Sequence, residues 1–120
     1  MADYKVIVMC GSTKFKEDFM IWARKLTLGG YIVHMPTIFS KAEEGTDLTP
    51  TQTAMLNDMH VQEINRCDAI FVVNKGLYID EDTKAEIEHA YENNKPVFYM
   101  ETDPENVKFM AVEPNPVGLL

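Results

Sequence analysis

The stretch that decides the fold is residues 69–100, which read AIFVVNKGLYIDEDTKAEIEHAYENNKPVFYM. An apolar run, 69–73, precedes a polar loop, a helical segment from Thr83 to Asn93, and a second apolar run, 97–100. Short apolar runs rich in β-branched residues are typical of strands that are buried on both faces. The stretch therefore predicts a strand–helix–strand unit of a parallel sheet.

The residues before this stretch repeat the same alternation. The predicted elements are a strand at 4–10, a helix from Lys14 to Gly29-Gly30, a strand at 31–35 and a helix from Pro50 to Asp68. Apolar residues at helical spacing support the first helix, and proline at the first helical position supports the second.

The element order predicts a small doubly wound α/β fold, a flavodoxin-like or Rossmann-like arrangement of three layers. Its simplest form has four parallel strands in the order 2-1-3-4 with right-handed crossovers. We expect residues 1–100 to form one α/β domain and the proline-containing tail, 101–120, to extend it. Residues 37–49 form a loop that is long for such a domain, which suggests a lid or binding loop.

Ligands of such folds bind where the strand order reverses, here between the first and third strands. Two loops meet at that point, residues 10–14 and residues 74–83. The Gly11-Ser12-Thr13 turn offers close backbone approach, hydroxyls and amides to a phosphate or a sugar. The alternative is that Gly11 only turns the chain and that Ser12 or Thr13 caps the following helix.

The second loop carries a pair of carboxylates, Asp80 and Glu86, six residues apart. One interpretation is structural: Thr83 is the N-cap of the third helix and Glu86 completes a capping box. The other is that Glu86 points into the crevice, because paired carboxylates around an anomeric carbon cleave glycosidic bonds. His60 has similar alternatives, a core histidine on an apolar helix face or a polar group of the pocket.

The composition limits the kinds of binding partner to be expected. The net charge is −8 and no cluster of Lys or Arg could follow a phosphate backbone, so a nucleic-acid polymer is an unfavourable partner. No apolar run has the length of a membrane span and no signal-peptide pattern is found. The two cysteines fit neither a zinc motif nor a disulfide framework, and the three histidines are scattered. We therefore expect a cytoplasmic protein with no metal and no cofactor.

Four motifs together resemble the nucleoside 2-deoxyribosyltransferase superfamily, which includes 2'-deoxynucleoside 5'-monophosphate N-hydrolases. They are Gly11-Ser12-Thr13, residues 67–73, Asp80-x5-Glu86-Ile87-x2-Ala90 and Lys95-Pro96-Val97. The resemblance implies that Glu86 is a nucleophile at the sugar C1' and that Asp80 helps to hold base or sugar. It also implies that the turn after the first strand contacts sugar or 5'-phosphate, and that the protein is a homo-oligomer.

The chain also departs from that family. Small residues are usual four and two positions before the nucleophile, where this chain has Asp82 and Lys84, and an acidic residue is common where it has His60. Either His60 takes a polar role in the pocket, or the site has been remodelled. The candidate catalytic residues are Glu86 and Asp80. The candidate substrate-binding residues are Cys10, Gly11, Ser12, Thr13, Phe15, Asp58, His60, Tyr78, Asp82 and Thr83.

Three functions follow from these observations. The first is an enzyme that cleaves or transfers the N-glycosidic bond of a nucleoside or its 5'-monophosphate. The second is a nucleotide-binding module of the same fold without catalysis, used for sensing or sequestering. The third is an interaction subunit with an empty crevice.

Overall fold

The computed structural model describes residues 3–39 and 47–102 of the chain. The described residues form a four-stranded parallel sheet in the order β2-β1-β3-β4. The strands are β1 (Val6–Gly11), β2 (Ile32–His34), β3 (Ala69–Val73) and β4 (Val97–Tyr99), and the helices are α1 (Lys16–Leu28), α2 (Pro50–Arg66) and α3 (Glu81–Glu92). The predicted α/β fold and strand order are confirmed.

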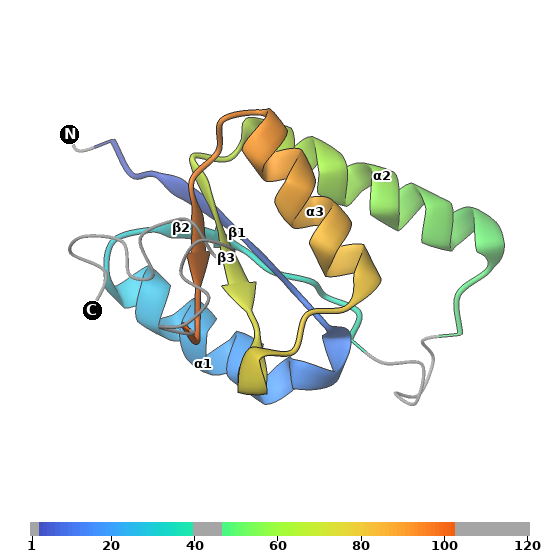
Figure 1. Cartoon of the computed structure of the whole chain (residues 1–120), viewed down its shortest axis with the longest axis horizontal. Coiled ribbons are helices and arrows are strands. Elements are labelled where there is room, and N and C mark those ends of the chain that lie inside the picture. The colour runs from blue at the N-terminus through green and yellow to red at the C-terminus, as the bar shows by residue number, and fades with distance from the viewer. Residues whose placement is uncertain (1–2, 40–46, 103–120) are drawn as a thin grey trace.

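The helices form the two outer layers of the fold. In Figure 1, α2 and α3 lie together over one face of the sheet, and α1 covers the other. Side chains of alternate strand positions fill the two interfaces: Val8, Ile70 and Val72 face α2 and α3, whereas Ile7, Met9 and Phe71 pack towards α1. This division follows from the period of two along a strand, which sends successive side chains to opposite faces.

The centre of the sheet explains the apolar runs in the sequence. All five residues of β3 are buried, and so are the four central residues of β1. The edge strand β2 is different, because Ile32 is 48% exposed. The most continuous apolar run therefore marks the strand with neighbours on both sides and helices on both faces.

Gly11 ends β1 at a close approach between two strands. Its φ is +151°, and a Cβ placed there would lie 2.6 Å from the carbonyl oxygen of Val73 on β3. A larger residue would therefore clash with the neighbouring backbone. Glycine lets the chain leave the sheet tightly, through the short 3-10 turn η1 (Thr13–Phe15), into α1.

The N-terminus of α3 differs from the sequence prediction. The helix begins at Glu81, and its N-cap is Asp80, whose Oδ1 accepts a hydrogen bond of 2.8 Å from the Thr83 backbone N–H. The predicted Thr83–Glu86 capping box is therefore wrong. Thr83 is buried inside the first turn, and the loop residue Asp80 reaches the amide that needs a partner.

A buried asparagine connects the loop between β3 and α3 to the segment that follows β4. Asn74 follows β3, and its side chain donates to the Glu101 carbonyl and accepts from the Glu101 N–H, each at 2.8 Å. The Glu101 carboxylate in turn accepts from the Leu77 N–H, within the 3-10 turn η2 (Lys75–Leu77), at 3.2 Å. These bonds fix the loop that leads into α3.

Two sequence predictions fall partly outside the described residues. The predicted lid, 37–49, includes residues 40–46, and the predicted C-terminal extension, 101–120, includes residues 103–120. Within the described ranges, none of the helices is both long and apolar enough to cross a bilayer.

Candidate active site

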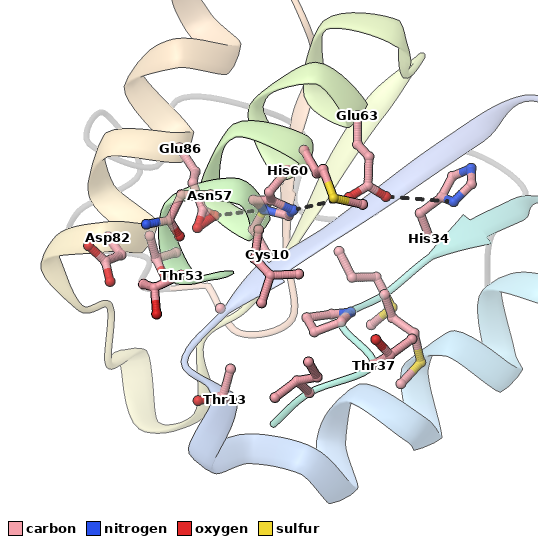
Figure 2. Close-up of a pocket in the computed structure, with 18 of the residues that line it drawn as sticks. Cys10, Thr13, His34, Thr37, Thr53, Asn57, His60, Glu63, Asp82 and Glu86 are labelled. Atoms are coloured by element: carbon pink, nitrogen blue, oxygen red, sulfur yellow. Dashed lines mark hydrogen bonds and ion pairs between the residues drawn. The ribbon is translucent and has the colours of Figure 1, made fainter. Parts of the chain in front are cut away.

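A cavity of about 490 Å³ opens at the carboxyl ends of β1 and β2, between α2 and α3. Its lining comprises residues from β1 and the turn after it, the segment after β2, one face of α2, and the N-terminal half of α3. Figure 2 draws 18 of the lining residues and labels ten of them, namely Cys10, Thr13, His34, Thr37, Thr53, Asn57, His60, Glu63, Asp82 and Glu86. The cavity adjoins the predicted strand-order reversal, because its lining includes the turn after β1 and the start of α3, the helix that follows β3.

Glu86 of α3 and His60 of α2 form the central pair of the site. The distance between Glu86 Oε2 and His60 Nε2 is 2.9 Å, and the two side chains are 20% and 22% exposed. The side chain of Glu86 therefore points across to the neighbouring helix instead of back to its own N-terminus. A histidine nitrogen and a carboxylate at this distance share a charge-assisted hydrogen bond.

The environment of His60 favours its charged form. Burial by itself lowers the pKa of His60, but the hydrogen bond to Glu86 and the negative charges of Glu86 and Glu63 outweigh burial. The pKa of His60 is therefore raised from the usual 6.5. The pair carries its positive charge on His60 and its negative charge on Glu86 when His60 is protonated.

Glu63 continues this row of polar groups along the cavity. One of its carboxylate oxygens lies 3.7 Å from His60 Nδ1, and the other lies 3.7 Å from Nδ1 of His34 at the end of β2. Figure 2 shows Glu86, His60, Glu63 and His34 following one another across the pocket. Carboxylate and imidazole groups therefore alternate along the row, which links α3, α2 and β2.

Cys10 lies directly beneath the central pair. Its Sγ is 3.5 Å from His60 Nε2, and the residue is 1% exposed. Burial raises the pKa of the Cys10 thiol well above its usual value, and the charge of Glu86 raises it further. Both effects favour the protonated thiol.

Comparisons with known proteins show which solved structures share the fold of this chain. No protein-family model matches the chain, and no curated protein matches it. Solved structures do match. A 2-deoxyribosyltransferase from Leishmania mexicana is 20% identical with a TM-score of 0.55, and the match covers 96% of this chain and 76% of that one. The chain has the fold of the nucleoside 2-deoxyribosyltransferase superfamily.

Two further structures of this fold are similar. The CMP N-glycosidase of Clostridium botulinum is 16% identical with a TM-score of 0.56, and the match covers 92% of this chain and 84% of that one. A conserved protein from Enterococcus faecalis V583 is 18% identical with a TM-score of 0.58, over 85% of this chain and 66% of that one. At these identities the likeness extends to the fold and not to individual residues.

Eight of the sequence-predicted site residues line the cavity of this deoxyribosyltransferase-like fold. They are Cys10, Gly11, Thr13, His60, Asp80, Asp82, Thr83 and Glu86. They come from the end of β1 and the turn after it, from α2, and from the N-cap and first turns of α3, so the hydroxyl-bearing turn and the carboxylate-bearing segment lie at one cavity. Asp80 has a second contact as the N-cap of α3, which holds its carboxylate at the helix start.

The other four predicted site residues lie away from the cavity lining. Ser12 is the N-cap of the turn η1, with its hydroxyl 3.4 Å from the Lys14 N–H. The Phe15 ring packs edge-on against the Tyr78 ring at 5.9 Å and joins the core under α1. Asp58 accepts a hydrogen bond from Gln62, one turn further along the exposed side of α2.

Several polar lining residues were not among the sequence candidates. They are His34, Thr37, Thr53, Asn57 and Glu63. The sequence held a signal for two of them. Glu63 lies three residues after His60 and so shares its helix face, and His34 ends a strand at the carboxyl edge, where ligands bind.

Proposed function

We propose that this protein is an enzyme that cleaves or transfers the N-glycosidic bond of a nucleoside or its 5'-monophosphate, with Glu86 as the nucleophile. The observation that carries the proposal is the position of Glu86. Its carboxylate lies in the cavity at the strand-order reversal and is held there by His60 from a different helix. A carboxylate that only capped a helix or faced solvent would not be placed this way.

The reaction needs an ionised carboxylate at the anomeric carbon. A Glu86 oxygen attacks C1' of the sugar, the bond from C1' to the base nitrogen breaks, and the base leaves with that electron pair. Water then hydrolyses the glycosyl ester, or a second base takes the sugar from it. His60 acts as a positioning residue, because its hydrogen bond to Glu86 Oε2 fixes the orientation of the carboxylate, which stays ionised.

The cavity suits a ligand of this class. Its volume of about 490 Å³ falls within the range of small-molecule sites. Thr13, Thr53 and Asn57 supply hydroxyl and amide groups along the walls, which are the groups that recognise sugar hydroxyls and base edges. The names of two similar structures, a CMP N-glycosidase and a 2-deoxyribosyltransferase, support the same substrate class.

A second candidate is a nucleotide-binding module without catalysis. The observation that favours it is Asp82, a carboxylate in the cavity wall four residues before Glu86, where the resemblance calls for a small residue. The Asp82 side chain takes up space that the sugar would need, and it adds a second negative charge beside Glu86. This candidate predicts a saturable rise in melting temperature with nucleotide and no product.

Release of free base separates the two candidates. We expect chromatography of reactions with a panel of nucleosides and 5'-monophosphates to show base release by the wild-type chain. Glu86→Gln removes the nucleophile, and the rate of release should fall by at least about 10³-fold. Glu88→Gln is the matched control, because Glu88 lies on the exposed side of the same helix. Full activity in the Glu86 variant would exclude the proposed mechanism.

The assembly and location of the protein remain predictions from the sequence. We expect a homo-oligomer in the cytoplasm. Light scattering of the purified protein measures its oligomeric state. A strictly monomeric chain with full activity would show that the site is complete within one chain.

A further inference from the structure

Cys10, His60 and Glu86 bring together three kinds of metal ligand from three separate elements. The side-chain ligand atoms of the three residues all lie within 4.8 Å of one another. The sulfur of Cys10 is 3.5 Å from His60 Nε2, and that nitrogen is 2.9 Å from Glu86 Oε2. The sequence could not reveal this cluster, because its members are separated by 50 and 26 residues.

Two of these separations can be compared with the ligand distances of a tetrahedral zinc site. Zinc binds cysteine sulfur at about 2.3 Å and histidine nitrogen at about 2.0 Å, which at the tetrahedral angle places the two ligand atoms about 3.5 Å apart. The Cys10–His60 distance of 3.5 Å matches that value. The His60–Glu86 distance of 2.9 Å is that of a hydrogen bond, so the carboxylate must move back by a few tenths of an ångström.

Glu63 completes the environment that metal-binding histidines usually have. With Nε2 on the metal, the proton of His60 resides on Nδ1, which faces the Glu63 carboxylate at 3.7 Å. A carboxylate behind a ligating histidine fixes its tautomer and orientation. All three ligand residues line the cavity, so the fourth position of a metal ion is open to water or substrate.

We propose that Cys10, His60 and Glu86 form a binding site for one Zn²⁺ ion. Binding replaces the hydrogen bond between His60 and Glu86 with two metal bonds and adds a third to the Cys10 thiolate. The thiol proton of Cys10 passes to solvent, and a protonated His60 also gives its Nε2 proton to solvent. The thiolate and imidazole ligands select Zn²⁺ over Mg²⁺ and Ca²⁺, which prefer oxygen ligands.

Metal binding has a consequence for catalysis that rests on the proposed function. The carboxylate that attacks the sugar is the same carboxylate that binds the metal. Zn²⁺ therefore inhibits base release, and a chelator restores it. The site is then a zinc-sensitive switch on the nucleophile and not a cofactor site.

Cobalt spectroscopy of the untagged full-length chain tests the metal site without any substrate. Co²⁺ is the probe, because a cobalt–thiolate bond gives a near-ultraviolet charge-transfer band. We expect one equivalent of Co²⁺ to produce the band and one equivalent of Zn²⁺ to remove it. The chain has two cysteines, so the variants Cys10→Ser and Cys67→Ser identify the ligand. Cys67 is buried elsewhere, with its thiol bonded to the Ile64 carbonyl, and serves as the matched control.

The expected pattern is loss of the band in Cys10→Ser and its retention in Cys67→Ser. His60→Gln should weaken cobalt binding by at least about 10-fold. That is roughly the smallest loss of affinity seen when a group that supports a metal ligand is changed. A wild-type chain without the band, or a band that persists in Cys10→Ser, overturns the proposal. If no nucleoside is cleaved, the proposed function fails while the cobalt result still decides the metal site.

Discussion

Replacing His60 by glutamine should destabilise the protein by an amount that depends on pH. At an effective dielectric constant near 20, two unit charges about 4 Å apart attract by about 4 kcal/mol before desolvation is counted. Charge-assisted hydrogen bonds contribute about 1.5–3 kcal/mol after that correction. The His60–Glu86 pair has a distance of 2.9 Å and side chains that are about one-fifth exposed, so we expect about 2 kcal/mol under mildly acidic conditions.

The sign of the pH dependence follows from the raised pKa of His60 in the folded state. The charged groups that face His60 are Glu86 from α3 and Glu63 from α2, and the Cys10 thiol faces it from β1. The stabilisation is fully present below the unfolded pKa of about 6.5 and is lost as pH rises through the raised folded pKa. The destabilisation by His60→Gln should therefore be larger at pH 5.5 than at pH 9.

Urea unfolding of the wild-type protein and of His60→Gln, at pH 5.5 and at pH 9, measures the loss of stability at each pH. His34→Gln is the control, because His34 also faces Glu63 but is 51% exposed, where ion pairs contribute at most about 1 kcal/mol. Equal destabilisation by His60→Gln at both pH values would refute the argument that the protonated histidine stabilises the fold.

Three further substitutions have definite expected outcomes. Glu86→Gln should abolish base release and leave a folded chain by circular dichroism, and a fold lost together with activity would assign Glu86 a structural role instead. Gly11→Ala should cost at least about 2 kcal/mol in urea unfolding, because its Cβ would lie 2.6 Å from the Val73 oxygen; no cost would mean that the strands separate easily there. Asn74→Ala should cost about 2–3 kcal/mol, since the Glu101 N–H and carbonyl lose their partners, and an unchanged unfolding midpoint would show that water replaces them.

The sequence predicted the fold well because the decisive signals are local and repeated. The apolar run 69–73 is a strand with all five residues buried, and strand–helix alternation leaves few possible topologies. The strand-order reversal then placed the two loops at one cavity, although they are far apart in the chain. No knowledge of individual contacts was needed for that step.

The sequence failed where two residues of similar chemistry competed for one role. Both Asp80 and Thr83 can cap a helix, and the pattern Thr83–Glu86 favoured the wrong one. Packing decides between them: Thr83 is 1% exposed, whereas Asp80 remains in the loop with its carboxylate free to reach the Thr83 amide. Spacing alone does not contain that information.

The sequence named Cys10, His60 and Glu86 as site residues but did not predict their contacts with one another. Cys10 and His60 meet the carboxylate through tertiary packing of β1, α2 and α3, over separations that no linear motif spans. Phe15 was a candidate for substrate binding, but its ring packs against the core under α1 and does not line the cavity. Helix periodicity indicated that role for Phe15, and the structure agrees with the periodicity.

The central claim is that the Glu86 carboxylate forms a bond to the sugar, and peptide mass spectrometry tests it most directly. The chain is incubated with a cleavable nucleoside whose sugar carries a 2'-fluorine, which slows hydrolysis of a glycosyl ester, and is then digested with trypsin. We predict that the sugar mass is found on the tryptic peptide 85–108, at Glu86, and is absent from the Glu86→Gln variant. Base release without sugar on that peptide, or with sugar on another residue, would contradict the account.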